Sequence, residues 1–129
     1  MATILAVDDQ RMMRDLVKTV LESDGHTVLV AEDGVQAMTV ARDQAADLVL
    51  SDINMPNMNG ISLVSKLRRL DSYADVPIIM LTTESADFKK DKAKKMGANG
   101  WLQKPFDPPR LIKAVRSMLA KAGHVLPAA

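Results

Sequence analysis

The stretch that decides the fold is residues 47–60, which read DLVLSDINMPNMNG. An apolar run that ends on Asp52 and leads into a loop rich in Pro, Asn and Gly is typical of a buried strand ending at a sheet edge. In open α/β sheets, ligands bind outside the carboxyl ends of the strands. We therefore expect the Asp52 carboxylate to belong to a site at that edge.

Two further strand-like runs end on charged side chains. The acidic pair Asp8 and Asp9 follows the apolar run 3–7, and Lys104 follows the weaker run 100–103. Parallel strands of one sheet share the edge at which they end. These charged groups are therefore expected in the same site.

The remainder of the chain alternates strand-like and helix-like patterns. Runs typical of strands buried on both faces are residues 3–7, 47–51 and 76–81, and the weaker runs, expected at the sheet edges, are 26–31 and 100–103. Apolar stripes with helical spacing lie between and after them, including a poorly apolar one at residues 86–96.

Five strand–helix repeats predict an α/β fold: a flavodoxin-like (βα)5, doubly wound, parallel five-stranded sheet with strand order 2-1-3-4-5. Strands one and three are neighbours in this order, so Asp8, Asp9 and Asp52 are expected to converge. We assign residues 1–122 to one domain and expect residues 123–129 to form a disordered tail.

Composition narrows the class of protein. The 129 residues include no cysteine, which fits a reducing compartment, and the N-terminus lacks the basic and apolar segments of a signal peptide. No apolar run approaches the ~20 residues that a membrane span needs. We expect a soluble, cytoplasmic, monomeric protein that does not bind membranes.

The net charge of +1 hides an asymmetry. Residues 1–65 hold 4 Lys/Arg and 10 Asp/Glu, whereas residues 66–129 hold 13 and 6. The acidic half contains the candidate site, so a cation is the expected ligand there. The lysine-rich segment 89–95 is either a solvated helix face or a surface for an acidic partner or nucleic acid. Only 3% of residues are aromatic, which disfavours single-stranded nucleic acid as a ligand.

The three carboxylates suggest a particular chemistry. Close carboxylates repel one another, and a divalent cation such as Mg²⁺, which takes oxygen ligands and keeps several waters, relieves that repulsion. Asp52 would retain an oxygen able to attack phosphorus. The Lys104 ammonium and the Thr82 hydroxyl, which follows run 76–81, could hold phosphoryl oxygens. Taken singly, each residue has an ordinary structural role; their joint occurrence favours the site.

At these positions the sequence resembles response-regulator receiver domains, and in particular CheY-like single-domain chemotaxis regulators. The matching motifs occur in the family's order and spacing and span nearly the whole chain: VDD at 7–9, SDINMP at 51–56 with Gly60, LTTE at 81–84 and GANGWLQKPF at 97–106.

The resemblance implies a role for each matched residue. Asp52 would accept a phosphoryl group from a CheA-like histidine kinase, and Lys104 would pair with that group. Mg²⁺ would be held by Asp8, Asp9, Asp52 and the main-chain carbonyl of Asn54. The protein would act as a signalling switch, catalysing only its own phosphorylation and dephosphorylation, so it is not expected to be an enzyme in the usual sense.

The resemblance also implies a switch. Thr82 would move toward the phosphoryl group, and Trp101 would stand for the aromatic residue that follows it inward, altering a face made of helix 86–96, strand 100–103 and the last helix. Asn54 and Glu84 would flank the phosphoryl group and shorten its lifetime. The Lys104–Pro105 bond would be cis. Departures from the family pattern are the bulkier Thr83, Asn59 in place of a frequent Asp, and the larger Trp101.

Two other classes of protein fit poorly. Haloacid-dehalogenase-like phosphatases need a second Asp two residues after the nucleophile, where this chain has Asn54. A flavodoxin-type FMN protein needs a phosphate loop after strand one, where Asp8 and Asp9 would repel phosphate.

Three roles in signalling remain open: a chemotaxis messenger that binds the flagellar switch and controls flagellar rotation, a phosphate sink for a chemotaxis kinase, or a stand-alone receiver for another output protein. A phosphatase is a further possible partner. No DNA-binding segment follows Ala122, so no direct contact with nucleic acid is expected.

Overall fold

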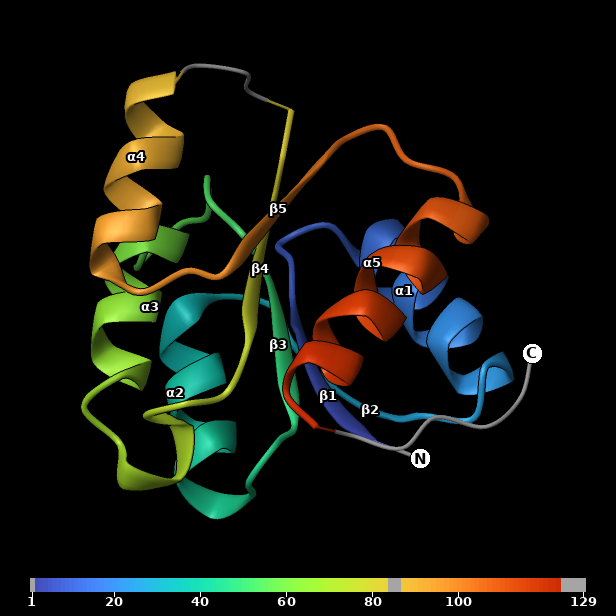
Figure 1. Ribbon diagram of the computed structural model, residues 1–129. Helices are drawn as coiled ribbons and strands as arrows, with labels where there is room; N and C mark the ends of the chain where they lie inside the picture. Colours follow the sequence, from blue (N-terminus) through green and yellow to red (C-terminus); the bar gives the residue numbers. More distant parts are fainter. Residues whose placement is uncertain (1, 84–86, 124–129) are drawn as a thin grey trace.

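The computed structural model describes residues 2–83 and 87–123, and the side chains of residues 84–90 lie outside the described part. It contains five strands, five α-helices and one short 3₁₀ helix in alternating order (Figure 1). The strands are β1 Thr3–Val7, β2 Thr27–Ala31, β3 Leu48–Asp52, β4 Ile78–Thr82 and β5 Gly100–Gln103. The helices are α1 Arg11–Ser23, α2 Gly34–Asp43, α3 Gly60–Leu67, η1 Asp71–Tyr73, α4 Asp87–Met96 and α5 Pro108–Lys121.

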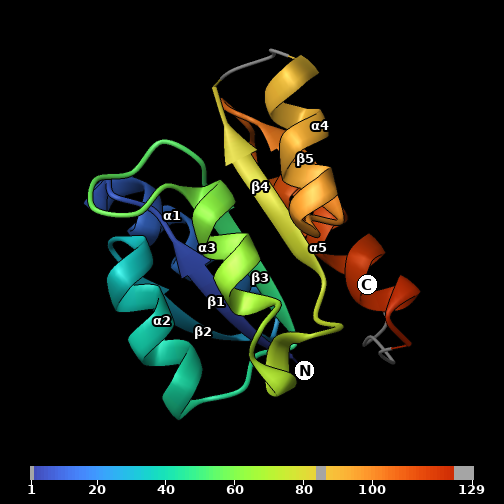
Figure 2. The ribbon, with the colours of Figure 1, turned by 90° about the vertical axis from the view of Figure 1, so that its left-hand side faces the viewer.

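The strands form one parallel sheet in the order β2-β1-β3-β4-β5, so the predicted fold class and strand order are confirmed. Helices α1 and α5 cover one face of the sheet, and α2, α3 and α4 cover the other (Figures 1 and 2). No helix among the described residues has the length and apolarity needed to cross a bilayer.

Alternation along the central strands divides the core between the two faces. In β1, Leu5 and Val7 pack under α2 and α3, whereas Ile4 and Ala6 pack under α1 and α5. All five residues of β3 and all five of β4 are buried, as expected for central strands of a sheet covered on both sides.

Some predicted boundaries were wrong by one or two residues. Asp52 is the last residue of β3 and pairs in register with Leu81 of β4, so the phosphoacceptor candidate is held by the ladder itself. Strand β4 begins at Ile78 because Pro77 has no N–H to donate, and it extends to Thr82. The predicted helix start at Ala86 and the tail residues 124–129 lie outside the described residues.

The partly buried guanidinium of Arg68, just after α3, fastens the C-terminal end of α4 to the body of the protein. It donates to the main-chain oxygen of Gly97 at 2.6 Å and to Oδ1 of Asn99 at 2.7 Å. It also donates to the oxygens of Tyr73 at 2.8 Å and Val76 at 2.6 Å. One side chain thus joins the α3–β4 connection to the turn between α4 and β5.

Candidate functional site

The candidate site lies at the carboxyl ends of the strands, where β1 and β3 are neighbours at the centre of the sheet. Asp8, Asp9 and Asp52 each place a carboxylate oxygen within 4.8 Å of the other two. Asp8 and Asp52 are buried, whereas Asp9 is exposed. The predicted convergence of the three carboxylates is confirmed in this arrangement.

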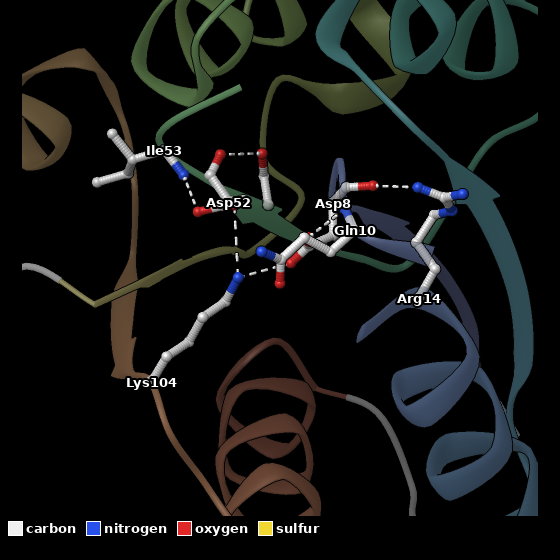
Figure 3. Close-up of polar contacts among 7 residues, drawn as sticks. Asp8, Gln10, Arg14, Asp52, Ile53 and Lys104 are labelled. Atoms are coloured by element: carbon white, nitrogen blue, oxygen red, sulfur yellow. Dashed lines mark hydrogen bonds and ion pairs between the residues drawn. The ribbon is translucent and has the colours of Figure 1, made fainter. Parts of the chain in front are cut away.

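Lys104 reaches these carboxylates from the residue after β5. Its Nζ lies 2.7 Å from Oδ2 of Asp8 and 3.4 Å from Oδ2 of Asp52, and Figure 3 shows the ammonium between the two acids. The lysine is only 9% exposed, so its charge interacts with both acids in a poorly solvated setting. The main-chain N–H of Lys104 donates to the main-chain oxygen of Thr82 at 2.7 Å, which fixes the backbone of Lys104 against β4.

Main-chain groups fix the two buried carboxylates. Oδ1 of Asp52 accepts the N–H of Ile53 at 2.8 Å, and Oδ1 of Asp8 accepts the N–H of Gln10 at 2.9 Å (Figure 3). Arg14 of α1 donates to the main-chain oxygen of Asp8 at 2.8 Å. Each acid therefore keeps its other oxygen, Oδ2, turned toward Lys104.

Burial raises the pKa of the Asp52 carboxyl above its usual range. The Lys104 ammonium opposes this rise, and the negative charge of Asp8 adds to it. The ionised form of Asp52 is therefore disfavoured by its surroundings, and added positive charge would stabilise it.

The loop after β3 returns closely onto Asp52. The N–H of Gly60 donates to the oxygen of Ile53 at 2.8 Å, and a Cβ at Gly60 would clash with the main-chain oxygen of Asp52 and with the Met80 side chain. Only glycine fits this close approach at the start of α3. Asn59 caps α3 by accepting the N–H of Ser62 at 2.8 Å, which accounts for a helix-capping side chain at that position.

The other predicted site residues occupy the same edge of the sheet or the elements beside it. Thr82 is fully buried at the end of β4, and Asn54 is exposed two residues beyond Asp52. Trp101 lies on β5, half-buried against the core beneath α4. The Lys104–Pro105 bond is cis, as predicted. Glu84 lies outside the described residues.

Two contacts in the site were not predicted from the sequence: the Gln10 N–H and the Arg14 guanidinium, both on Asp8. An Asp whose side chain accepts the N–H two residues onward forms a common turn, so the Gln10 contact had a local signal. Arg14 had none, since an arginine on an exposed helix face is ordinary.

Three carboxylates and a lysine at the switch point of a doubly wound parallel sheet define the class of this protein as a flavodoxin-like α/β domain with an acidic site. The model of the response regulator receiver domain family matches residues 4–116, and the chain belongs to that family. Receiver domains of two-component systems take phosphoryl groups from histidine kinases and act on output partners, and they generally bind Mg²⁺ at an acidic pocket.

Particular relatives differ in how much of their length the chain matches. It is 40% identical over 118 residues to a chemotaxis protein CheY homolog of Campylobacter jejuni, covering 90% of this chain and 91% of the relative. It is 36% identical over 121 residues to the phosphate regulon transcriptional regulatory protein PhoB of Pseudomonas aeruginosa, covering 94% of this chain but only 53% of PhoB. The solved structure of Vibrio cholerae CheY4 superposes with a TM-score of 0.89 at 42% identity, covering 92% and 98% of the two chains.

Proposed function

We propose that this receiver domain accepts a phosphoryl group on Asp52 from a histidine kinase and thereby switches the face formed by α4, β5 and α5. The observation that carries the proposal is the pairing of a buried, main-chain-fixed Asp52 with Lys104 3.4 Å away, beside two further carboxylates. This arrangement places a nucleophile, a counter-charge and a set of metal ligands at one strand edge.

The donor set fits Mg²⁺. Three carboxylates within 4.8 Å supply the hard oxygen ligands that this ion takes, and the exposure of Asp9 leaves room for water ligands. Asp8, Asp9 and Asp52 would hold the ion together with the main-chain oxygen of Asn54. Bound Mg²⁺ would supply positive charge to the phosphoryl oxygens and to Asp52.

The residues of the site would then share the transfer. The Asp52 carboxylate attacks phosphorus, the P–N bond to the kinase histidine breaks, and the bond's electron pair leaves with the imidazole. Lys104 holds a phosphoryl oxygen in the charge-stabilising role that such transfers require. The hydroxyl of Thr82, at the end of β4, would hold another phosphoryl oxygen in the same way. Hydrolysis of the phosphoryl group would proceed beside Asn54 and Glu84.

The switch would run from Thr82 to Trp101. Thr82 is fully buried on the strand between Asp52 and Trp101, so a shift of its side chain toward the site vacates core volume. A hollow of about 210 Å³, lined in part by Ala93 and Lys94 of α4, lies beside Trp101. The indole therefore borders a hollow in its present position, and a shift of Thr82 would give it room to move inward, so that two alternative positions become available.

We infer that the output belongs to chemotaxis. The support is the similarity to the Campylobacter jejuni CheY homolog, to which the chain is 40% identical, and to Vibrio cholerae CheY4, with which it superposes at a TM-score of 0.89 and 42% identity. A monomer in the cytoplasm that binds a flagellar switch protein, and that a phosphatase resets, fits this role. A phosphate sink and a receiver for another output protein are the alternatives that partner binding separates.

The test begins with labelling by acetyl phosphate or a phosphorylated histidine kinase. Wild type should be labelled in the presence of Mg²⁺ and not after chelation, and Asp52→Asn should not be labelled. Asp43→Asn, an exposed carboxylate at the end of α2, is the matched control and should label normally. Wild-type labelling of Asp52→Asn would exclude Asp52 as the acceptor.

Phosphotransfer from a panel of purified histidine kinases then identifies the donor. Capture of partners by the beryllofluoride-activated protein separates the three roles. Retention of a flagellar switch protein supports the messenger, whereas rapid phosphotransfer with no protein retained supports the phosphate sink.

A further inference from the structure

A groove of about 340 Å³ is lined by residues of α3 and α4 and of the segments that flank α3. These two helices lie on the face of the sheet opposite α1 and α5 (Figure 2). Its charged lining consists of Lys66 and Arg69 from the α3 side and Lys92 from α4, and no acidic side chain among the described residues lines it. The groove is distinct from the hollow beside Trp101, which shares none of its lining residues.

The three cations of the groove are not neutralised by the part of the chain that the structure describes. Lys66, Arg69 and Lys92 are exposed, and none of them forms an ion pair with a described carboxylate. By contrast, Lys104 is paired with buried acids and Arg116 with Asp24. The groove is therefore a concave surface of a single sign of charge, which concentrates anionic ligands.

The groove also has an apolar component. Ile61 and Met96 line it between the cations, and Met96 is 40% exposed, one of few large apolar side chains of the described residues that are so accessible. Methionine adapts its shape to different partners. A ligand that places one apolar side chain between acidic ones would match both the charge and the chemistry of this surface.

We propose that the α3–α4 groove is a docking site for an acidic peptide segment of a partner protein, with an apolar side chain seated against Met96 and Ile61. Charge complementarity selects this occupant: three cations that no described carboxylate pairs with, around an apolar patch, match glutamate and aspartate flanking a leucine. Each exposed ion pair is weak on its own, so affinity depends on several pairs being made together.

The position of the groove gives such a ligand a route to the rest of the molecule. One wall is α3, whose first residue, Gly60, packs on the main chain of Asp52. The other wall is α4, which carries part of the lining of the hollow beside Trp101. A peptide that joins the two walls would hold α4 in one position relative to α3.

The test is direct binding, measured by fluorescence anisotropy, of a fluorescein-labelled peptide in which one leucine is flanked on both sides by glutamates. We expect saturable binding to wild type, and a loss of affinity of about tenfold or more when Lys66, Arg69 and Lys92 are together reversed to Glu, since each exposed pair contributes a few-fold. The control carries the same charge change on α1 and α5, across the sheet from the groove: Lys18→Glu, Lys113→Glu and Lys121→Glu. It should bind within about threefold of wild type, because screening weakens exposed charges beyond roughly 10 Å.

The apolar seat is tested separately. Replacing the peptide leucine by serine, or Met96 by Ser, should each weaken binding, and combining the two should add little. Unfolding midpoints of all variants establish that the fold is intact. Equal loss in the two charge-reversed triples, or no saturable binding to wild type, overturns the proposal. A single-stranded oligonucleotide with the same charge as the peptide is tested in the same assay. If it binds wild type more tightly than the peptide does, and the groove triple abolishes that binding, the groove is a nucleic-acid site and the proposal is overturned.

Discussion

The ammonium of Lys104 is the charge that compensates the buried acids of the metal-free site. Its Nζ lies 2.7 Å from Oδ2 of Asp8 and 3.4 Å from Oδ2 of Asp52. The side chain of Lys104 is 8% exposed, that of Asp8 4% and that of Asp52 11%. The substitution Lys104→Met keeps most of the apolar stem and removes the charge. We predict that this variant is strongly destabilised without metal and that Mg²⁺ restores part of the loss.

The two distances set the size of the attractions that the variant loses. At an effective dielectric constant of about 20, the two attractions are ~6 and ~5 kcal/mol, and desolvation of the ions offsets much of both. Removing one partner of a buried ion pair nevertheless leaves uncompensated charge, at a cost of about 3–5 kcal/mol in unfolding free energy. The deficit should shrink as pH falls, because a buried carboxylate without its counter-charge binds a proton more readily in the folded state.

Urea denaturation followed by circular dichroism, with EDTA or with Mg²⁺, measures these effects. The proposed Mg²⁺ would neutralise the same carboxylates as Lys104, so the variant should bind the ion more tightly than wild type. A tenfold gain in affinity adds about 1.4 kcal/mol at saturation. The control Lys113→Met, on the exposed side of α5, should change stability by no more than about 0.5 kcal/mol.

The double variant Asp8→Asn/Lys104→Met distinguishes lost charge compensation from lost packing. It should recover stability relative to Lys104→Met, since one of the two uncompensated carboxylates has been removed. Should Lys104→Met unfold in EDTA at the same urea concentration as wild type, the ammonium does not compensate buried charge and the reasoning is refuted.

Two further predictions concern the switch and pH. Beryllofluoride with Mg²⁺ should change the emission of Trp101, the only tryptophan, and Thr82→Ala should blunt the change while leaving phosphorylation intact; flat emission from a fully occupied site would mean that Trp101 does not move. Burial lowers the pKa of His26 more than Asp24, whose Oδ2 lies 3.3 Å away, raises it. The folded state thus excludes a proton that the unfolded histidine binds near pH 6.5, so stability should fall below about pH 6.5, by at most ~1.4 kcal/mol per pH unit. His26→Gln should remove that slope in denaturation curves compared between pH 7 and 5, and parallel curves would exclude His26 as its source.

The sequence predicted those parts of the site that the sheet itself positions. Asp52 and Thr82 end buried strands, and Asp8 and Lys104 each follow a strand by one residue, so parallel pairing brings their side chains to one edge whatever the loops do. Sequence periodicity identifies strand ends well because burial on both faces leaves an unbroken apolar run.

Contacts that depend on loop geometry were not predictable in this way. The four principal acceptors of Arg68 are main-chain and amide oxygens from two loops, the farthest of them 31 residues along the chain. A guanidinium that binds mainly main-chain carbonyl oxygens leaves no charge pattern in the sequence, because every residue carries such an oxygen. The need for glycine at position 60 likewise arises only from how close the returning loop comes to Asp52.

The Arg68 contacts fix the C-terminal end of α4, next to Gly97, and leave its N-terminal end free of these contacts. Because the guanidinium holds the C-terminal end against η1 and the segment before β4, we expect a reorientation of the helix to be a rotation about that end rather than a translation. The helix Asp87–Met96 is about 15 Å long at ~1.5 Å per residue, so a pivot of about 10° would move its first turn by roughly 2.6 Å and its last turn hardly at all. The N-terminal end of α4, which follows β4 in the sequence, would therefore move farthest, while the end held by Arg68 would hardly move.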